Sequence, residues 1–464
     1  MAGPGGNGGD GLHAAAELRQ AGLEVTVTLV AEPDALAPEP AAALARARAA
    51  GCVIGTELPR AAPPLAIDAL LGLGAGRAPG GAFLAAIQAF NNMPGCRLAV
   101  DLPSGLHPDT GARLGHDAAY AHATLGLLTL KPALFTGAGR DHAGQAWFDD
   151  LGCEAGDAVP GPVARLASGA DVSAALVPRA HDRHKGSFGD VLVVGGAPGM
   201  VGALRLAAQG ALAAGPGRVF VSPLDPDLTL ADPQHPEWLW TPQAWLPGRH
   251  ALESDTVVCG CGGGAIVSEA LPAILGRAAR LVLDADALNA VSRDPQLRRQ
   301  LSARRARGQS TVLTPHPLEA ARLLGCDTAE VQADRPKAAR ELATLLGTIV
   351  VLKGSGTLVA SAGRLPVVNP TGSASLAVGG TGDVLAGWIA GQWAVCSAGE
   401  RDTHGESGWR SAVAATWLHG LAGERPAGAP IQASHLAGSM AAQAEAWRSI
   451  REAERLSGAC ASLP

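Results

Sequence analysis

The stretch "NPTGSASLAVGGTGDVLAGWIAG", residues 369–391, joins a glycine-rich turn to an acidic residue that opens an apolar helical pattern. The backbone N–H groups around Gly380 and Gly382 can hold phosphate oxygens, and the carboxylate of Asp383 can take a proton from an attacking hydroxyl. This combination predicts a phosphoryl-transfer site with Asp383 as its catalytic residue. The alternative interpretation is an aspartate that only caps a helix after a glycine turn.

Three more polar motifs follow apolar runs in the same half of the chain: "TPHPLE" with His316, "KGSGT" with Lys353, and "NPTG". Lys353–Thr357 offer a cation, small residues and hydroxyls, which suit a nucleotide phosphate, although the spacing is not that of a Walker A loop. His316 taken alone more often stabilises a turn. Because ligands of open α/β sheets bind beyond the carboxyl ends of the strands, we expect these motifs to converge near Asp383.

A second set of candidate residues lies near the N-terminus. "GGNGGDG", residues 5–11, is predicted to be a loop whose backbone approaches an anion such as phosphate, with an ordinary glycine turn as the alternative. Asp68 and Asp101 each close an apolar run and precede a glycine-containing loop. Each aspartate has the alternative role of an N-cap, but two acidic strand ends favour a binding site at one sheet edge.

The elements that must position these residues are apolar runs alternating with Ala-rich helical patterns, which predict βα units and parallel sheets. The runs are "LEVTVTLV", "LAIDALLG", "CRLAVDLPSG", "DVLVVGGAPG", "RVFVSPL", "DTVVCGCGGG", "RLVLDADALN", "STVLTPHPLE" and "TIVVLKGSGTLVAS". We therefore predict two doubly wound α/β domains, a Rossmann-like one at 1–160 and a second at 181–455. A Gly- and Pro-rich linker is predicted at 161–180. No strand precedes the first glycine loop.

The composition narrows the functional class. A net charge of −6 and an aromatic fraction of 3% provide neither an excess of basic residues nor many aromatic rings for binding nucleic acid. The predicted partner is therefore a small molecule. No apolar run approaches the roughly twenty residues of a membrane span, and no signal-peptide pattern opens the chain. We therefore expect a cytoplasmic protein that does not bind membranes. The 8 cysteines are scattered and are expected to be reduced, structural thiols.

The N-terminal motifs "GGNGGDG", "DALLGLGAGR" and "DLPSG" resemble the YjeF N-terminal domain, the family of NAD(P)HX epimerases, where NAD(P)HX is hydrated NAD(P)H. The resemblance implies a K⁺ ion held by Asn7, Asp68 and Ser104. It implies that Asp101 is a catalytic residue in contact with the hydrated nicotinamide. The remaining substrate-binding residues that it implies are Gly6, Asn7, Gly8, Gly9, Asp10, Gly72, Leu73, Gly74, Ala75, Gly76, Arg77 and Ala78.

This chain departs from the family pattern at Gly6, where a second Asn is usual, and at Leu73, where Thr is usual. The family also has a helix and a strand before the glycine loop. The resemblance therefore predicts an amino-terminally truncated domain whose central strand is absent and whose epimerase site lacks one wall.

The C-terminal motifs, from "HKGSFGDVLVVGGAPGMVGA" to "NPTGSASLAVGGTGDVLAG", are similar to the ADP/ATP-dependent NAD(P)HX dehydratases, which have a ribokinase-like α/β/α fold. The resemblance implies that Asp383 deprotonates the C6 hydroxyl of the hydrate, which attacks the terminal phosphoryl group of ADP or ATP in the presence of Mg²⁺. It implies a nucleotide site made of Lys353, Gly354, Ser355, Gly356, Thr357 and Gly382. It implies substrate contacts from Ala203, Gly264, His316 and Asp383.

Taken together, the two resemblances predict a bifunctional repair enzyme for hydrated NAD(P)H that dehydrates the (6S) form and epimerises the (6R) and (6S) forms. They also imply self-association into a homo-oligomer. The alternative is a small-molecule kinase of the ribokinase-like superfamily with a non-catalytic N-terminal binding module, since a fold does not determine a function.

Overall fold

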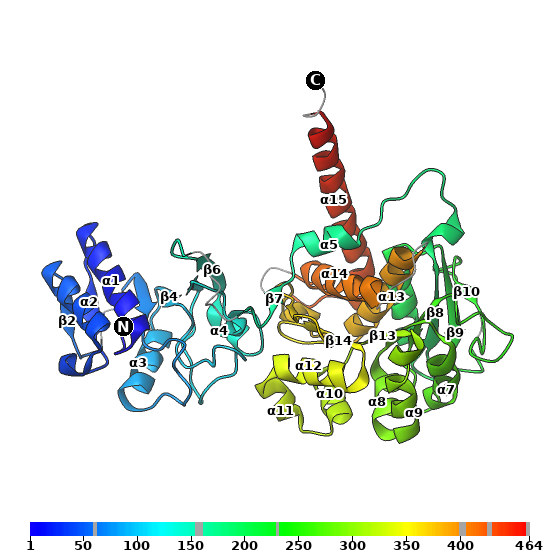
Figure 1. Ribbon diagram of the computed structural model, residues 1–464, viewed down its shortest axis with the longest axis horizontal. Helices are drawn as coiled ribbons and strands as arrows, with labels where there is room; N and C mark the ends of the chain where they lie inside the picture. Colours follow the sequence, from blue (N-terminus) through cyan, green and yellow to red (C-terminus); the bar gives the residue numbers. More distant parts are fainter. Residues whose placement is uncertain (59–62, 154–160, 229–231, 399–404, 425–428, 461–464) are drawn as a thin grey trace. The chain divides into compact units, whose positions relative to one another are not determined.

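The computed structural model describes residues 1–58, 63–153, 161–228, 232–398, 405–424 and 429–460 (Figure 1). The chain divides into two compact units. The first is Met1–Gly161, and the second is Pro162–Val331 together with Arg335–Pro464.

The first unit is an α/β unit in which helices alternate with parallel strands. A four-stranded parallel sheet has the order β3-β4-β5-β6, and β1 pairs in parallel with β2. Its helices are α1 (Gly6–Gln20), α2 (Pro38–Ala49), α3 (Gly81–Asn91) and α4 (Gly139–Ala143), with short 3₁₀ turns η1 (Pro33–Ala35) and η2 (Pro132–Leu134). Its strands are β1 (Thr26–Thr28), β2 (Val53–Gly55), β3 (Leu65–Asp68), β4 (Cys96–Val100), β5 (Ala123–Leu127) and β6 (Gln145–Asp149).

The residues before α1 connect β1 to β3. Ala2 forms isolated parallel bridges with Leu29 on one side and with Ala69 on the other. The Ala2 amide donates to the Thr28 carbonyl at 2.9 Å, and the Gly3 amide donates to the Ala69 carbonyl at 2.9 Å. Ala2 therefore forms isolated β-bridges directly before α1, at the position where a doubly wound fold has a strand.

The glycine-rich segment 5–11 is not the loop that the sequence predicts, because α1 already begins at Gly6. Its glycines instead allow close packing. A Cβ on Gly8 would lie 1.9 Å from the Gly3 carbonyl oxygen, and one on Gly11 would lie 2.4 Å from the Cβ of Ala69. Contacts this short exclude any side chain, so these glycines allow the first turns of α1 to pack directly against the sheet edge.

The second unit contains one large sheet with the order β10-β9-β8-β11-β12-β13-β14-β15-β16-β7. Its pairs are parallel except for β14 with β15 and β15 with β16. The strands are β7 (Arg165–Leu166), β8 (Asp190–Gly195), β9 (Arg218–Pro223), β10 (Leu239–Trp240), β11 (Thr256–Cys259), β12 (Arg280–Leu283), β13 (Ser310–Leu313), β14 (Ile349–Leu352), β15 (Leu358–Ala360) and β16 (Val367–Val368).

Helices cover this sheet, as Figure 1 shows. They are α5 (Gly169–Ala175), α6 (Val201–Ala214), α7 (Val267–Arg277), α8 (Ala285–Arg293), α9 (Pro295–Ser302), α10 (Pro317–Leu324), α11 (Thr328–Ala333), α12 (Arg335–Leu346), α13 (Thr381–Ser397), α14 (Glu406–Ala422) and α15 (Ala433–Cys460). The 3₁₀ turns are η3 (Lys185–Phe188), η4 (Arg305–Arg307) and η5 (Ala374–Leu376). The central strands are buried on both faces, as parallel sheets require, which explains why they are continuous apolar runs in the sequence.

Helices α6 and α13 pack at very short range in the core of this unit. A Cβ on Gly387 would lie 1.9 Å from the Ala207 carbonyl oxygen, and one on Gly391 would lie 2.3 Å from that of Ala211. In the opposite direction, a Cβ on Gly210 would lie 2.3 Å from the Val384 carbonyl oxygen. Glycines on both helices therefore fix the depth and rotation of α13, the helix that carries Asp383.

The segment 161–180, predicted to be a linker, is partly an element of the second unit. β7 pairs with β16, and α5 begins at a capping box formed by Ser168 and Asp171. A Cβ on Gly169 would lie 2.1 Å from the ring of Trp447, so α5 packs closely on α15. The linker was predicted from the Gly and Pro content of this segment, whereas Gly169 allows close packing between two helices.

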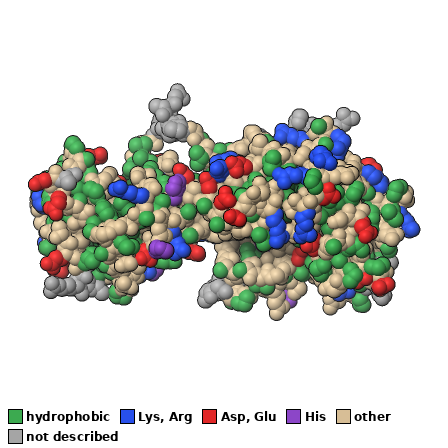
Figure 2. Space-filling view, turned by 90° about the horizontal axis from the view of Figure 1, so that it is seen from below, with side chains coloured by type: hydrophobic (Ala, Val, Ile, Leu, Met, Phe, Trp, Pro, Cys, Tyr) green, Lys and Arg blue, Asp and Glu red, His purple; other side chains and the backbone are tan. Residues whose placement is uncertain are grey.

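In the described part of the chain, no helix is both long and apolar enough to cross a membrane. Figure 2 shows basic, acidic and apolar side chains intermixed over one face of each unit. Such mixing is ordinary for a globular surface.

Candidate active sites

The carboxyl ends of neighbouring strands of the second unit bring polar groups together. β12 ends directly before Asp284, which is buried. Its Oδ1 accepts hydrogen bonds from the Thr314 hydroxyl at 2.8 Å and from the Lys353 ammonium at 2.7 Å. The Lys353 amide in turn donates to the Pro315 carbonyl at 2.9 Å. The predicted motifs "TPHPLE" and "KGSGT" therefore meet at one end of the sheet, together with "LDADALN", which was not among the motifs predicted to lie there.

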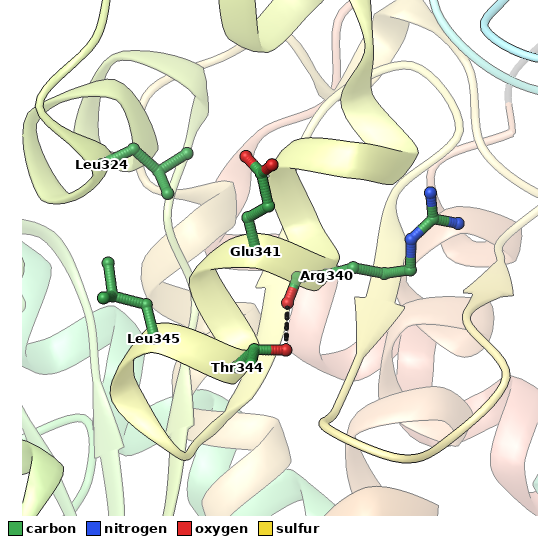
Figure 3. A pocket seen from close by; sticks show the side chains of 5 residues that line it. All are labelled: Leu324, Arg340, Glu341, Thr344 and Leu345. Atoms are coloured by element: carbon green, nitrogen blue, oxygen red, sulfur yellow. Dashed lines mark hydrogen bonds between the residues drawn. The ribbon is translucent and has the colours of Figure 1, made fainter.

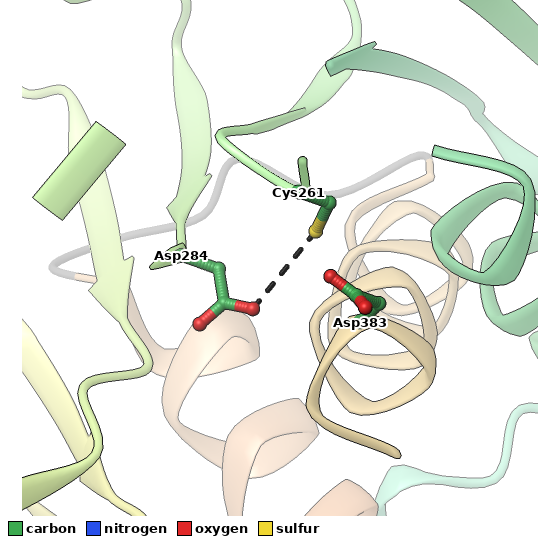
Figure 4. Close-up of side chains that lie close together, drawn as sticks. All are labelled: Cys261, Asp284 and Asp383. Carbon is green, nitrogen blue, oxygen red and sulfur yellow. Dashed lines mark hydrogen bonds between the residues drawn. The ribbon is translucent and has the colours of Figure 1, made fainter. Parts of the chain in front are cut away.

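Asp383 lies in the first turn of α13, which confirms the position predicted for it. The turn before the helix contains Gly380 at φ +93°, a left-handed conformation that favours glycine. The His419 ring of α14 donates to the Thr381 carbonyl at 3.0 Å. Figure 4 shows the side chains of Asp383, Asp284 and Cys261 directed toward one another, and one atom from each lies within 4.8 Å of the others.

Burial, and after it the nearby carboxylate of Asp284, raise the pKa of Asp383 to about 7. The Cys261 thiol and the Lys353 ammonium act in the opposite sense. Asp383 is therefore half ionised near neutral pH, the condition in which a carboxylate serves well as a general base.

The predicted nucleotide-binding residues adjoin this carboxylate. A Cβ on Gly382 would lie 3.2 Å from the Lys353 ammonium, so the glycine turn and the "KGSGT" loop are neighbours. Gly354 has φ +129°, and a Cβ there would meet the buried guanidinium of Arg335 at 3.1 Å. Gly354 and Ser355 are exposed and Gly356 has φ +61°, which gives a glycine-shaped loop open to a ligand.

The predicted substrate contacts lie on adjoining loops. Gly264 has φ +54°, and its amide donates to the Asp286 carboxylate at 2.8 Å. A Cβ on Gly262 would lie 2.9 Å from the Cβ of Ala203, so α6 borders the same loop. These glycines therefore allow the loop to pack closely against Met200 and Ala203.

His316 is the N-cap of α10, where its Nδ1 accepts from the amides of Leu318 and Glu319. Burial lowers the pKa of His316, and Lys353 lowers it further. Burial raises the pKa of Glu319 to about 6. The turn-stabilising role that the sequence left open for His316 is thus present, and a substrate contact from its other nitrogen stays a prediction.

Sequence reasoning missed Asp284 and Cys261. Asp284 directly follows an apolar run, the same signal that singled out Asp68 and Asp101. Cys261 carried no signal beyond its glycine neighbours, because a cysteine inside such a run is usually packing.

Cys261, Asp284 and Asp383 have the spacing of a metal site, but their chemistry does not fit Mg²⁺. Burial raises the pKa of the Cys261 thiol well above its usual range, and Asp284 is neutralised by Lys353. A protonated thiol is a poor ligand for a hard cation, so Mg²⁺ would meet one free carboxylate here. The cluster is better described as two neighbouring carboxylates with a thiol that donates to one of them, Asp284, at 3.9 Å.

In the first unit, three predicted cation ligands form one buried network. The Ser104 hydroxyl donates to Asp68 Oδ1 at 2.6 Å, and the Ser104 amide donates to Asp68 Oδ2 at 2.8 Å. The Asn7 amide group donates to the Leu71 carbonyl at 3.0 Å, while its buried Oδ1 has no hydrogen-bond partner among the described residues. Burial raises the pKa of Asp68, because it destabilises the ionised carboxylate, and a nearby cation would stabilise that ionised form.

Asp101 lies beside this network in a strained conformation, with φ +69°. The buried ammonium of Lys131 forms an ion pair with Asp101 and donates to the Leu127 carbonyl at 2.6 Å. Desolvation raises the pKa of Asp10, and Asp101 raises it further. Lys131 is a residue that sequence reasoning missed, although a lone lysine within "LGLLTLKPALF" is an unusual choice for an apolar segment.

The predicted loop Gly72–Ala78 follows β3. Gly72 adjoins Asn7, because a Cβ on Gly72 would lie 3.0 Å from the Cβ of Asn7. Leu73, Arg77 and Ala78 are exposed. The structure therefore brings one end of this loop to the cation network and leaves the rest at the surface.

A shallow depression on α10 and α12 is lined by Leu324, Arg340, Glu341, Thr344 and Leu345 (Figure 3). None of these residues is a candidate site residue, and the lining offers no group positioned for chemistry. It is therefore not a candidate active site.

The second unit is a layered α/β unit with a glycine turn, a basic loop and an acidic residue at one end of its sheet. This arrangement is typical of ribokinase-like enzymes, and comparisons with known proteins agree. Residues 191–443 match the NAD(P)H-hydrate dehydratase family, and residues 1–133 match the family of the YjeF-related protein N-terminus.

Among curated relatives, the chain is 36% identical over 398 residues to the bifunctional NAD(P)H-hydrate repair enzyme Nnr of Escherichia coli K12, covering 84% of this chain and 74% of that protein. It is 41% identical over 268 residues to an ADP-dependent (S)-NAD(P)H-hydrate dehydratase of Neisseria meningitidis, covering 57% of this chain and 86% of that protein. The chain belongs to the family of bifunctional NAD(P)H-hydrate repair enzymes.

Among solved structures, the second unit resembles the ADP/ATP-dependent NAD(P)H-hydrate dehydratase of Bacillus subtilis co-crystallised with ATP/Mg²⁺. The TM-score is 0.51 with 28% identity, and the match covers 61% of this chain and 99% of that one. A ribokinase-like protein of Enterococcus faecalis, 22% identical with a TM-score of 0.51, supports the fold alone.

Proposed function

We propose that this protein repairs hydrated NAD(P)H with two sites. The second unit dehydrates (6S)-NAD(P)HX with ADP as phosphoryl donor, and the first unit interconverts the (6R) and (6S) forms. The single observation that carries the dehydratase proposal is the position of Asp383, which lies in the first turn of α13 beside the lysine of the "KGSGT" loop and has a pKa of about 7.

In the dehydratase reaction, Asp383 takes the proton of the C6 hydroxyl, and that oxygen attacks the terminal phosphoryl group of ADP. AMP leaves, and the hydrate carries a phosphate ester on C6. Phosphate is then expelled from C6 with loss of a proton from C5, which restores the double bond of the reduced nicotinamide. The amides of the glycine turn and the Lys353 ammonium stabilise the charge that develops on the transferred group.

The remaining loops have supporting roles in this proposal. Lys353, Gly354, Ser355, Gly356, Thr357 and Gly382 hold the nucleotide, and Ala203, Gly264 and His316 contact the nicotinamide ring. Gly264 suits this role because its amide is held by Asp286 at 2.8 Å, which fixes the loop before the ligand arrives. Mg²⁺ would accompany the nucleotide phosphates and would offset part of their negative charge.

In the first unit, Asp101 and Lys131 are proposed to epimerise C6. Moving a hydroxyl from one face of C6 to the other requires that one oxygen receives a proton as it leaves. The entering water must lose a proton on the opposite face. A buried lysine paired with an aspartate can supply and accept these protons.

Asn7, Asp68 and Ser104 fit a K⁺ ion, because they provide hard oxygen donors and the buried Asn7 oxygen has no hydrogen-bond partner in the part of the chain that the structure describes. A K⁺ ion bound there would offset the charge of Asp68. A homo-oligomeric state and a cytoplasmic location also stay predictions.

The direct test is to incubate the protein with (6S)-hydrated NADH and ADP and to follow the return of reduced-nicotinamide absorbance. We expect NADH, AMP and phosphate in equal amounts. A small-molecule kinase of the same fold would instead accumulate a stable phosphorylated product, which would contradict the proposal.

A further inference from the structure

His419, in the last turn of α14, is a half-buried histidine that the proposed reaction does not use. Its ring nitrogen Nε2 lies 3.0 Å from the carbonyl oxygen of Thr381, the first residue of α13. A carbonyl oxygen can only accept a hydrogen bond, so the ring carries its proton on Nε2. His419 therefore donates to the residue that directly follows Gly379 and Gly380 of the glycine turn.

Thr381 anchors this turn. It is buried, whereas Val378 and Gly379 before it are exposed. Its hydroxyl donates to the carbonyl of Leu376 at 3.0 Å and to that of Val378 at 3.1 Å, which closes the turn. The His419 ring holds the carbonyl of the same residue, so Thr381 is fixed through both its side chain and its backbone.

α14 is itself fixed to the "NPTG" motif that precedes the turn. The Asn369 side-chain amide donates to the Thr416 carbonyl at 2.9 Å. A Cβ on Gly420 would lie 2.1 Å from the hydroxyl oxygen of Thr371, so the motif and the helix pack in direct contact. His419 thus donates from a helix that is held in place just before and just after it in the sequence.

The ring acts as a neutral donor. Burial lowers the pKa of His419 to about 4, and the Lys353 ammonium also lowers it, while the hydrogen bond to Thr381 acts in the opposite sense. The imidazole is therefore uncharged at neutral pH. Its contribution is the hydrogen bond to Thr381 and not a second positive charge beside Lys353.

We propose that His419 is a positioning residue for phosphoryl transfer, which holds the Thr381 carbonyl and thereby directs the amides of the glycine turn at the terminal phosphoryl group. This inference rests on the proposed function, in which those amides stabilise the charge on the transferred group. Because they act most strongly on charge that develops in the transition state, loss of the hydrogen bond should lower kcat more than it raises KM for ADP.

Two substitutions of His419 separate the donor from the ring. His419→Asn places its amide near the position of Nδ1 and does not reach Thr381, whereas His419→Gln places an NH₂ group near the position of Nε2. We expect kcat for dehydration of (6S)-hydrated NADH to fall about tenfold or more in His419→Asn, since removal of a whole oxyanion donor costs about 10² to 10³ and a displaced turn only weakens its donors. We expect kcat of His419→Gln within about threefold of the wild type, and KM for ADP within about threefold in both.

Ser407→Ala is the matched control. The Ser407 hydroxyl accepts from Trp393 Nε1 at 2.9 Å and lies 2.8 Å from the Ser397 hydroxyl, so it also joins α14 to α13, but at the end of α13 remote from the glycine turn. We expect this variant to lose thermal stability as His419→Asn does and to keep kcat within about twofold of the wild type. Equal kcat in the wild type and His419→Asn, equal losses in the Asn and Gln variants, or an equal loss in Ser407→Ala would overturn the proposal.

A measurement on the wild-type protein tests the contact even if a variant does not fold. ¹⁵N NMR of labelled histidine, with the His419 ring assigned through its backbone correlations, reports which ring nitrogen carries the proton. We expect a neutral ring protonated on Nε2 at pH 7, and a ring protonated on Nδ1 would overturn the proposal. The spectrum is independent of turnover, so a wild type that forms no NADH from the hydrate and ADP contradicts the proposed function, while the spectrum still decides the contact.

Discussion

At the scale of single residues, the proposed chemistry of the second unit depends on two carboxylates with different neighbours, Asp284, which is buried, and Asp383, which is half-buried. Asp284 forms an ion pair with Lys353 at 2.7 Å, while Asp383 lies near the Cys261 thiol and the Asp284 carboxylate. Because burial and the Asp284 carboxylate raise the pKa of Asp383 to about 7, Asp383 can take a proton near neutral pH. Asp284 thus contributes to the pKa that suits Asp383 to act as a base in the proposed reaction.

A pH profile tests this division of roles. Because Asp383 must be ionised to act as a base and its pKa is about 7, kcat/KM for dehydration should fall about tenfold per pH unit below that value and level off above it. Initial rates between pH 5 and 9 at limiting hydrate measure the limb. A limb near pH 4 would assign the dependence to an ordinary, exposed carboxylate.

The same raised pKa affects stability. Between about pH 4 and 7 the folded protein keeps a proton on Asp383 that the unfolded chain loses, so stability falls as the pH rises through this range and stays low above it. One unit of pKa shift corresponds to about 1.36 kcal/mol. The rise in the pKa of Asp383 from 3.8 to about 7 therefore lowers the free energy of unfolding above pH 7 by at most about 4 kcal/mol.

Asp383→Asn removes this charge and should therefore stabilise the second unit above pH 7 but not at pH 4. Thermal unfolding of the wild type and the variant at both pH values measures the difference. Equal melting temperatures at pH 8 would argue that Asp383 is well solvated.

At the scale of elements, the position of Asp383 is set by how α13 lies on α6. A Cβ on Gly387 would lie 1.9 Å from a backbone carbonyl of α6, and backbone cannot move aside as a flexible side chain can. The helix therefore owes its register to glycines that make no contact with substrate.

Gly387→Ala should destabilise the second unit by about 1 to 3 kcal/mol and lower dehydratase turnover, because the helix must shift to admit a methyl group. Gly276→Ala in α7 is the matched control, since a Cβ there meets nothing within 4 Å and should be neutral or stabilising by about 0.5 to 1 kcal/mol. Denaturant unfolding and kcat measure both. A Gly387→Ala variant as stable as the control would contradict the packing account.

The same elements show how far sequence reasoning reached. Apolar runs predicted β1, β3, β4, β8, β9, β11, β12, β13 and β14, because strands of parallel sheets are buried on both faces and leave a continuous signal. Short strands such as β7 and β16 have too few residues for such a signal. Glycine was misjudged at 5–11, where it permits close packing of a helix instead of opening a loop.

Site residues followed a similar rule. Asp383 and Lys353 stand in motifs whose residue types imply their chemistry, so the sequence predicts them, and their roles stay predictions. Cys261 and Lys131 were missed, because their significance depends on partners far away in sequence that only folding brings near.

At the scale of the whole molecule, each of the two compact units carries its own proposed acid–base group. The group of the first unit is Asp101 with Lys131, and the group of the second unit is Asp383 with Asp284 and Cys261. Each group is assembled entirely from residues of its own unit.

Substitution within the acid–base group of one unit should therefore leave the reaction proposed for the other unit unchanged. Lys131→Met should lower epimerisation by roughly a hundredfold or more, as expected for loss of an acid–base group, and leave dehydration of purified (6S)-NADHX within about twofold of the wild type. Chromatographic separation of the two epimers measures the first rate, and absorbance measures the second. Parallel loss of both activities would show that the sites are not independent.

The most direct test of the central claim compares the wild type with Asp383→Asn in a single turnover of (6S)-hydrated NADH with ADP. The account predicts that the variant folds and binds ADP as the wild type does but forms NADH about 10² to 10⁴ times more slowly. NADH formation by the variant at the wild-type rate would show that Asp383 is not the base and would contradict the account.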